Sequence, residues 1–350
     1  MKKPSLLFFH IGSTSFVRKD IALLSERYAV TSFHFDTKEK KTIPLRFLAQ
    51  FFFLLRKARS AEIFVCFFAG YHSFLPAVFG RLMSKPVHII LGGADCYSYP
   101  EFGYGHLVKP VLAWFTCRSA RMATLLLPVD ESLMLASSSY FKPDHKQGIR
   151  HHCQDLRTPH LTIPLEYDGE IFKRRWAEKA PLSFLTVGFG IGGSNFYRKG
   201  IDLVLEAATL FPQGQFTILG AEAKQMKVPI PDNVRFLAPV PYESLPEIYS
   251  QHRFYLQISI AEGFPSAICE AMLCECVPVG SPVAAIPEII GNSGFLLPQR
   301  DGNLLAALLK EVGSRDDLEK LGREARSRIQ TRYAPGSRSA VLFKVMNPAG

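Results

Sequence analysis

The sequence predicts an α/β protein of two domains, each built on a parallel, doubly wound sheet. Short apolar runs rich in β-branched and aromatic residues alternate with stretches of helical character, in one series from residue 5 and in a second from residue 182. At 350 residues the chain is also longer than one ordinary core supports. We expect a first domain over 1–165, a linker over 166–181, a second domain over 182–332, and a tail over 333–350 that returns toward the first domain.

The first series contains six runs that predict strands: SLLFFHIG, VTSFHF, EIFVCFFAG, VHIILGG, TLLLP and LTIP. The start of the chain lacks the long apolar region and the cleavage site of a signal peptide, so we interpret it as the first strand. The uncharged stretch from Ile63 to Gly80 is broken by Gly70 and Pro76, which favours a strand and a helix over a membrane span. Residues 137–160 are polar, and we expect a surface connection there.

The second series contains LSFLTVG, FTILG, VRFLAPV, FYLQISI and VPVGS, again with helices between them. The two series therefore predict two Rossmann-like domains. Near the C-terminus, the apolar residues of a charged segment recur at the spacing of one helix face: Leu318, Leu321, Ala325 and Ile329. We expect this helix to close the second domain.

Composition and charge exclude several classes of protein. Hydrophobic residues make up 47% of the chain and charged residues 21%, which excludes collagen-like, coiled-coil and wholly disordered chains. Through Leu165 there are 21 Lys and Arg against 11 Asp and Glu, whereas the remainder is balanced at 20 against 20. The first half thus carries the whole net charge of +10, which suits an anionic partner.

The chain has seven cysteines, an odd number that cannot all pair, and several lie in apolar runs. We therefore interpret them as reduced core residues of a cytosolic protein. Cys269, Cys274 and Cys276 lack the paired spacing of a zinc site. His151, His152 and Cys153 suggest a solvated loop more than a metal site. We therefore expect no bound metal.

The stretch from Ser259 to Ser281 is the most informative part of the sequence. FYLQISI ends a strand, Gly263 permits a tight turn, and Pro265 suits a helix start. Backbone N–H groups at such a helix N-terminus stabilise an anion, and a diphosphate is the natural ligand. Glu262 and Glu270, eight positions apart, both border the carboxyl end of that strand, where open α/β sheets bind ligands.

Glu262-Gly-Phe-Pro, Glu270 and the following PVG and GNSGFLL runs together resemble the E-x7-E signature of family-4 retaining glycosyltransferases. The resemblance implies the GT-B fold, in which two Rossmann-like domains face a central cleft. It also implies that Glu270 holds the nucleotide ribose. The donor sugar and its diphosphate would then face Glu262, Gly263, Phe264 and Pro265.

A second match to that family is VGFGIGGSNFYRKG. The family has a glycine after the first strand of this domain, here Gly188, then an arginine, and a lysine in a Lys-Gly pair. The resemblance assigns the arginine role to Arg198 and the lysine role to Lys199. Both cations would lie at the mouth of the site and neutralise the diphosphate leaving group, so we expect Glu262, Lys199 and Arg198 to be the catalytic residues.

The same glycines leave an alternative open. Gly188, Gly190 and Gly193 have the spacing of a dinucleotide fingerprint, but residues 195–199 separate them from the next predicted helix, and an acidic residue at the usual distance is missing. A dinucleotide-dependent enzyme is therefore the less favoured hypothesis.

Two loops of the first domain occupy positions where the family contacts donor and acceptor. One contains Gly12, and the other is GGADCYSYPEFGYG, in which Asp95 is the charged residue of the turn. Many relatives carry a histidine in that loop, and this chain has Gly92-Gly93-Ala94-Asp95 instead. We expect Gly12 and Asp95 to contact the donor, with an ordinary turn as the alternative for Asp95.

Residues 38–60 interleave cations with a dense Phe and Leu face. This pattern fits a helix on an anionic membrane surface, and it equally fits an amphipathic helix packed on the sheet. No nucleic-acid-binding module is recognisable, so we expect no nucleic acid partner.

The sequence thus predicts a glycosyltransferase that uses a nucleotide sugar, a UDP- or GDP-sugar, with no obligate cofactor. The resemblance implies retention of configuration and a glycan, lipid-linked or other cell-envelope acceptor. The reduced cysteines and the amphipathic segment 38–60 together predict a cytoplasmic protein that is peripheral at the inner face of the membrane. A non-catalytic subunit that binds a nucleotide sugar or a membrane surface remains an alternative, because the loop histidine is missing.

Overall fold

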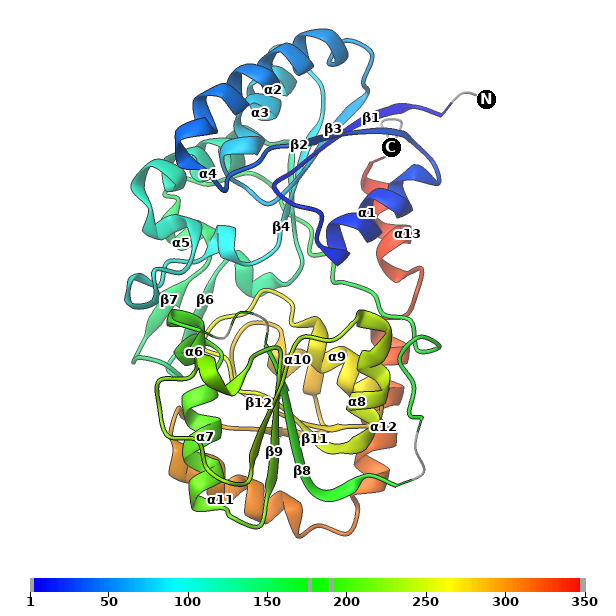
Figure 1. The fold of residues 1–350 in the computed structure, drawn as a ribbon. Coiled ribbons are helices and arrows are strands. Elements are labelled where there is room, and N and C mark those ends of the chain that lie inside the picture. The colour runs from blue at the N-terminus through cyan, green and yellow to red at the C-terminus, as the bar shows by residue number, and fades with distance from the viewer. Residues whose placement is uncertain (1–2, 176–177, 189, 191, 347–350) are drawn as a thin grey trace. The chain divides into compact units, whose positions relative to one another are not determined.

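The computed structural model describes residues 3–175, 178–188, 190 and 192–346, which form two compact units (Figure 1). Unit 1 consists of Met1–Ala136, Lys146–Pro164 and Gly336–Gly350, and unit 2 consists of Ser137–His145 and Leu165–Pro335. Of the predicted linker and tail, residues 176–177 and 347–350 lie outside the described residues.

Unit 1 is built on a parallel sheet with the strand order β2-β1-β3-β4-β5. The runs of β3 and β4 are buried at every position, as expected for strands covered on both faces. The strands are β1 (Ser5–His10), β2 (Ala29–His34), β3 (Ile63–Phe67), β4 (Val87–Leu91) and β5 (Leu125–Pro128).

The helices of unit 1 cover both faces of this sheet (Figure 1). The strand order runs one way from β1 to β2 and the other way from β2 to β5. Right-handed crossovers therefore place α1 on one face and α2, α3 and α4 on the opposite face. The helices are α1 (Ser15–Ser25), α2 (Ile43–Lys57), α3 (Tyr71–Leu82), α4 (Pro110–Met122), α5 (Ile149–His152) and α13 (Ser337–Val345).

The C-terminal helix α13 packs against α1 within unit 1. Arg338 of α13 donates from Nε and Nη2 to the two carboxylate oxygens of Asp20, at 2.8 Å each. Only 3% of either side chain is exposed. A buried ion pair with two parallel hydrogen bonds thus holds the end of the chain on the first unit.

Unit 2 is built on a second parallel sheet, with the order β10-β9-β8-β11-β12-β13. Phe184, Phe216 and Phe254 stack across its three central strands, with ring centroids 4.9 and 5.0 Å apart. The strands are β8 (Ala180–Val187), β9 (Gln215–Leu219), β10 (Val234–Leu237), β11 (His252–Gln257), β12 (Val277–Gly280) and β13 (Phe295–Leu296).

Within the part of unit 2 that the structure describes, seven helices accompany this sheet. Figure 1 shows them around its strands. They are α6 (Ser194–Arg198), α7 (Ile201–Leu210), α8 (Leu245–Gln251), α9 (Ser266–Leu273), α10 (Ile286–Ile290), α11 (Gly302–Gly313) and α12 (Leu318–Arg332). Leu321, Ala325 and Ile329 of α12 are buried, as their spacing predicted. Short 3₁₀ turns lie at Lys40–Thr42, Ala94–Cys96, Pro100–Phe102, His106–Val108, Glu131–Leu133, Ala223–Gln225 and Tyr242–Ser244.

Two predicted segments differ from the structure. The run LTIP is not a strand, although Leu161 and Ile163 donate backbone hydrogen bonds to β5. Pro159 lies just before the run and Pro164 ends it, and neither supplies an N–H, which limits the ladder. The predicted surface connection contains a short hairpin of β6 (Ala136–Ser138) and β7 (His145–Gln147), followed by α5.

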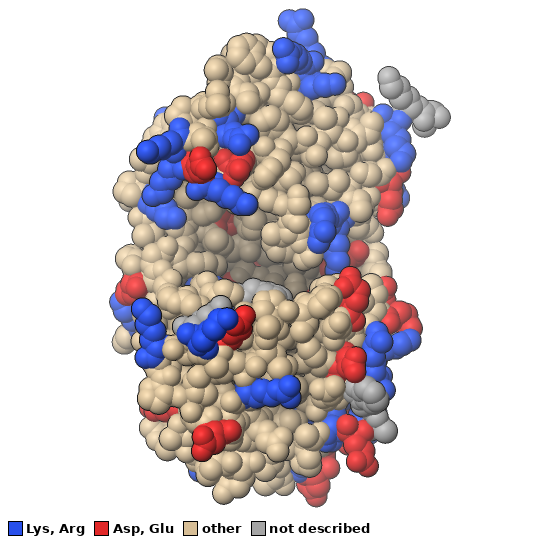
Figure 2. Space-filling model, in the orientation of Figure 1, with Lys and Arg blue, Asp and Glu red and all other residues tan. Residues whose placement is uncertain are grey.

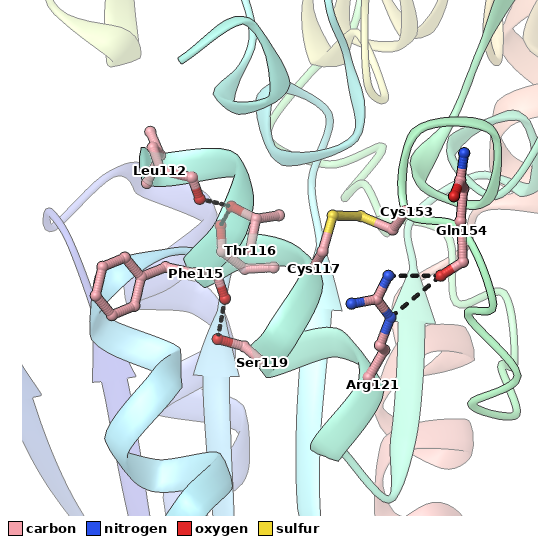
Figure 3. The surroundings of a disulfide bond; sticks show 9 residues. Leu112, Phe115, Thr116, Cys117, Ser119, Arg121, Cys153 and Gln154 are labelled. Atoms are coloured by element: carbon pink, nitrogen blue, oxygen red, sulfur yellow. Dashed lines mark hydrogen bonds between the residues drawn. A yellow bond between two sulfur atoms is a disulfide. The ribbon is translucent and has the colours of Figure 1, made fainter. Parts of the chain in front are cut away.

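The prediction that all cysteines are reduced is wrong for two of them. Cys117 of α4 and Cys153 form a disulfide with a Cα–Cα distance of 5.3 Å (Figure 3). Beside it, the Arg121 guanidinium donates two hydrogen bonds to the carbonyl of Gln154. The disulfide and this arginine together hold α4 against the segment after α5. The other five cysteines are unpaired and buried.

The stretch from Ile63 to Gly80 forms β3 and most of α3, as predicted. Among the helices of the described residues, none combines the length and the apolar character needed to cross a membrane.

Candidate functional site

The predicted site residues of unit 2 gather at the carboxyl edge of its sheet. Strands β8 and β11 pair directly, and the strand order reverses between them, since β9 lies beyond β8 on the other side. In open α/β sheets this reversal point is where ligands bind. The segments after β8 and β11 carry the predicted catalytic residues, so the topology brings together residues more than 60 positions apart.

Gly188 directly follows β8 and is buried, with its N–H bonded to the carbonyl of Leu219 at 2.9 Å. After it, Gly190 and Gly193 adopt φ of 63° and 64° and lead into α6. Gly193 is thus the residue before a five-residue helix, and it does not lie within the longer helix α7 that follows. This context differs from that of a dinucleotide fingerprint, in which the third glycine packs inside the helix.

Gly200 explains the Lys-Gly pair. Its φ is 72°, and a Cβ placed there would collide with the carbonyl oxygen of Ile258, the residue after β11. Only glycine meets both conditions without strain. Close approach of the two segments at Gly200 positions the neighbouring Lys199 beside the end of β11.

Arg198 is expected at the mouth of the site, and that expectation is wrong. The side chain is buried, with 8% exposed, and its Nη1 donates to the carbonyl of Ala261 at 2.9 Å. Its Nε donates to Asn195, and its own carbonyl accepts from the N–H of Ile260 at 2.8 Å. Arg198 therefore holds the segment after β11 by two hydrogen bonds, and its charge lowers the pKa of the nearby Glu262.

Lys199 and Glu262 form an ion pair of 2.5 Å, with 18% and 11% of their side chains exposed. The same Glu262 oxygen also accepts hydrogen bonds from Ser259 at 2.7 Å and from Gln257 at 3.1 Å. Burial by itself raises the pKa of Glu262, but the charges of Lys199 and Arg198 and the hydrogen bonds from Lys199 and Ser259 outweigh it. The pKa is therefore below its usual value, and Glu262 is a carboxylate at neutral pH.

Gly263, Phe264 and Pro265 are buried and lead into α9, which begins at Ser266. Pro265 is the residue before the first helical turn, one position earlier than predicted. The Phe264 ring lies against Tyr333, at a centroid distance of 5.2 Å, and stacks on Tyr167. These contacts fix the turn that presents the N-terminus of α9.

Glu270 lies on α9 and is 6% exposed. Tyr242 donates to one of its carboxylate oxygens and Tyr249 to the other, both at 3.2 Å. Sequence reasoning missed both tyrosines, because they precede Glu270 by more than 20 residues and carry no motif. They fix the orientation of the carboxylate that the family resemblance assigns to the ribose.

Gly12 and Asp95 belong to unit 1. Gly12 follows β1, and a Cβ placed there would meet open space. Asp95 is fully buried, and its carboxylate accepts backbone hydrogen bonds from Ala69, Gly92 and Gly93. Burial raises the pKa of Asp95, while these hydrogen bonds and His106 act in the opposite direction. In this structure the side chain orders its own loop, as in the alternative of an ordinary turn.

Among the described residues, no group of three or more His, Cys, Asp and Glu side chains is arranged to hold a metal ion. Cys269, Cys274 and Cys276 are each buried in unit 2. Burial raises the pKa of all three thiols. These three cysteines therefore belong to the hydrophobic core of unit 2.

The central part of the second unit matches a known protein family. Residues 186–314 match the model of a protein family described as glycosyl transferases group 1. The O-antigen chain mannosyltransferase B of Escherichia coli is 36% identical over 74 residues, which make up 21% of this chain and 19% of that protein. The aligned segment thus spans about a fifth of that relative's length.

Solved structures resemble this chain over nearly its whole length. Sucrose-phosphate synthase from Thermosynechococcus elongatus has a TM-score of 0.71 at 14% identity, over 98% of each chain. The Anabaena protein HepE, in its complex with UDP-glucose, has a TM-score of 0.69 at 14% identity, over 97% of this chain and 99% of that chain. The fold is the GT-B fold that the sequence predicted.

Proposed function

We propose, from the premise that residues 186–314 belong to the glycosyl transferases group 1, that this chain is a retaining glycosyltransferase. Its donor is a nucleotide sugar, a UDP- or GDP-sugar, and its acceptor is a glycan, a lipid-linked sugar or another cell-envelope molecule. The E. coli relative acts on an O-antigen chain, and the Anabaena structure holds UDP-glucose, which supports this choice of acceptor and donor. The reaction requires no obligate cofactor.

The donor binds at the carboxyl edge of the sheet of unit 2. The Glu270 carboxylate, oriented by Tyr242 and Tyr249, accepts hydrogen bonds from the ribose hydroxyls. The diphosphate lies at the N-terminus of α9, where backbone N–H groups and the helix dipole favour an anion. Gly188 and the turn at Gly263 give the diphosphate close access to the backbone.

Lys199 supplies a positive charge that can exchange its partner from Glu262 to the diphosphate. Its ammonium donates to Glu262, so a diphosphate that reaches Lys199 competes with this carboxylate for the same protons. As the bond between sugar and diphosphate breaks, negative charge grows on the leaving oxygen. Lys199, with Arg198 behind it, stabilises that charge, and this is the main source of rate enhancement in the proposal.

The Lys199 and Glu262 ion pair at the reversal point of the sheet is the observation that carries this proposal. A thermal-shift screen of UDP- and GDP-sugars identifies the donor, since a ligand at 100 times its dissociation constant adds about 2.7 kcal/mol of stability. Calorimetry with that donor then tests the site. Glu270→Ala and Lys199→Ala should each weaken binding by about 10- to 150-fold, because a charge-assisted contact contributes about 1.5–3 kcal/mol.

Glu247→Ala is the matched control, since Glu247 is an exposed glutamate of the same unit. Its donor affinity should equal that of the wild type. Unchanged affinity in both Glu270→Ala and Lys199→Ala would overturn the assignment of the site.

A second candidate is a subunit that binds a nucleotide sugar without catalysis. The loop at Asp95 favours it, because the loop lacks the histidine of many relatives and the Asp95 carboxylate accepts hydrogen bonds from the backbone. Donor binding that depends on Glu270, combined with neither transfer nor donor hydrolysis, would favour this candidate over the enzyme.

A further inference from the structure

Helix α2 exposes a row of large apolar side chains. Leu45, Leu48, Phe52 and Leu55 are 66%, 52%, 48% and 52% exposed, and their spacing of three and four residues puts them on one face of the helix. Phe51 lies beside this row and is 38% exposed. A surface helix normally directs polar residues outward, so this face of α2 departs from the usual pattern.

The opposite face of α2 already supplies the contacts to the core. Phe47 packs on Phe35 and Phe115, at centroid distances of 5.3 and 5.2 Å, and Phe53 packs edge-on against Phe9. Leu54 is fully buried. The helix thus packs on the sheet with one face and keeps a second apolar face exposed.

The two neighbouring helices extend this surface. The Phe51 ring meets Phe79 of α3 at 5.7 Å, and Phe74 of α3 meets Trp114 of α4 at 5.5 Å. Trp114 is 50% exposed. Exposed residues on all three helices form what we call the apolar face of unit 1: Leu45, Leu48, Phe51, Phe52, Leu55, Leu82, Val111 and Trp114.

The charges on these helices all have one sign. Helices α2, α3 and α4, all fully described, contain no Asp or Glu. Their exposed cations include Arg56, Lys57, Arg81 and Arg118. Further exposed cations adjoin the helix ends at Lys40, Lys41, Arg59 and Lys109. In Figure 2, blue side chains interrupt the tan surface at the top and upper left, with few red ones among them.

Some acids do lie near this surface. Asp36 is 3.8 Å from Arg46, and Glu39, Glu62 and Glu101 are exposed in the connections to these helices. They leave the balance positive, because the cations between residues 40 and 61 have no acid among them.

We infer that the apolar face of unit 1 docks on an anionic lipid bilayer. Apolar side chains enter the boundary between headgroups and acyl chains, while Lys and Arg contact the lipid phosphates. Insertion of these side chains into the bilayer removes their apolar area from water, which is favourable. A surface that bound lipid by charge alone would not need exposed apolar residues. A second copy of the chain is disfavoured as the partner, since two such faces would oppose cations to cations.

The test uses the full chain and two kinds of vesicle, pure phosphatidylcholine and phosphatidylcholine mixed with phosphatidylglycerol, in a sedimentation assay. We expect binding to the mixed vesicles that weakens as salt is added. The double variant Lys57→Ala with Arg59→Ala should lose about fivefold in binding for each cation removed. The double variant Leu48→Ser with Phe52→Ser should lose binding at every salt concentration.

Matched controls come from unit 2. Leu304→Ser removes a comparably exposed leucine, and Arg323→Ala removes an exposed cation. Both should bind as the wild type does, and thermal unfolding should show that all variants fold. Equal binding to the two kinds of vesicle, or wild-type binding by the Leu48 and Phe52 variant, would overturn the inference. A dimer in solution that this variant abolishes, without vesicle binding by the wild type, would also overturn it and assign the face to a second copy.

Discussion

Lys199 and Glu262 are joined by an ion pair of 2.5 Å that connects the segments following two adjacent parallel strands, β8 and β11. Each partner has a separate support: Gly200 allows the lysine segment to approach β11, and Ser259 and Gln257 hold the glutamate oxygen. The pair is therefore pre-positioned by the sheet and not by the two side chains alone. Its chemistry can be tested by changing one charge at a time.

Glu262→Gln should separate two proposed roles of Glu262, the ion pair with Lys199 and the contact with the donor sugar. Glutamine keeps the size of the side chain but removes the charge that holds Lys199, so Lys199 becomes more available to a diphosphate. Calorimetry should find tighter binding of UDP or GDP alone, whichever matches the donor, by several-fold. Turnover with the complete nucleotide sugar should fall. Weaker binding of the nucleoside diphosphate in this variant would contradict the proposed competition.

Arg338→Ala should strongly destabilise unit 1. The guanidinium forms two hydrogen bonds to the buried Asp20 and another to the carbonyl of Ile163. Removal of one partner leaves a buried charge alone, which costs about 3–5 kcal/mol in the free energy of unfolding. Urea denaturation measures this loss.

Two further variants complete that test. The double variant Asp20→Ala with Arg338→Ala should lose less than the sum of the two single variants. Arg332→Ala breaks an exposed pair with Glu288 and should cost no more than about 1 kcal/mol. Equal losses in Arg332→Ala and Arg338→Ala would show that burial of the Asp20 pair adds nothing.

The ion pairs of Glu319 should make the free energy of unfolding depend on pH in the acidic range. Hydrogen bonds from Arg174 and Arg253 lower the pKa of Glu319 to about 2, against an ordinary value of 4.5. Because the pKa is lower in the folded state, the contribution is complete above 4.5 and is lost as the pH falls toward 2. Glu319→Gln should thus lose less stability than the wild type on acidification, and added salt should shrink the difference, since the side chain is 45% exposed.

The measurement for Glu319 is urea denaturation at a pH above 4.5 and again between 4.5 and 2. Glu324→Gln serves as the control, because its pairing with Lys320 is looser, at 3.8 Å. Identical acid sensitivity of Glu319→Gln and the wild type would contradict the assignment.

Reduction of the Cys117 and Cys153 disulfide should destabilise the protein. The bond joins residues 36 positions apart, and closing a loop of that length stabilises a fold by about 3–4 kcal/mol. A reductant should lower the unfolding free energy of the wild type but not that of Cys117→Ser. Thiol titration of the unfolded, unreduced protein should find five free thiols. Seven thiols would contradict the pairing.

Proximity explains why the structure changes some sequence-based predictions. Cys117 and Cys153 lie in different segments, and neither the number of cysteines nor their spacing indicates which two Cα atoms approach to 5.3 Å. Arg198 looked like a surface cation at the head of a helix, but its carbonyl partner at Ala261 comes from another strand end. Asp95 lies in a glycine loop that suits a ligand contact, but its carboxylate accepts hydrogen bonds from the neighbouring backbone N–H groups.

Two features of this protein followed from the sequence alone. The alternation of apolar runs with helical stretches determined two parallel sheets, because the period of side-chain burial is local. The Lys-Gly pair at Lys199 and the spacing of Glu262 and Glu270 predicted the candidate donor site, since a strand-to-helix junction that binds an anion favours particular residues. Tertiary structure decided the rest, including the tyrosines that orient Glu270, the disulfide, and which face of α2 stays outside. These depend on contacts between distant segments, and the physical reason is that hydrogen bonds, covalent sulfur bonds and burial act over a few ångströms in space whatever the separation along the chain.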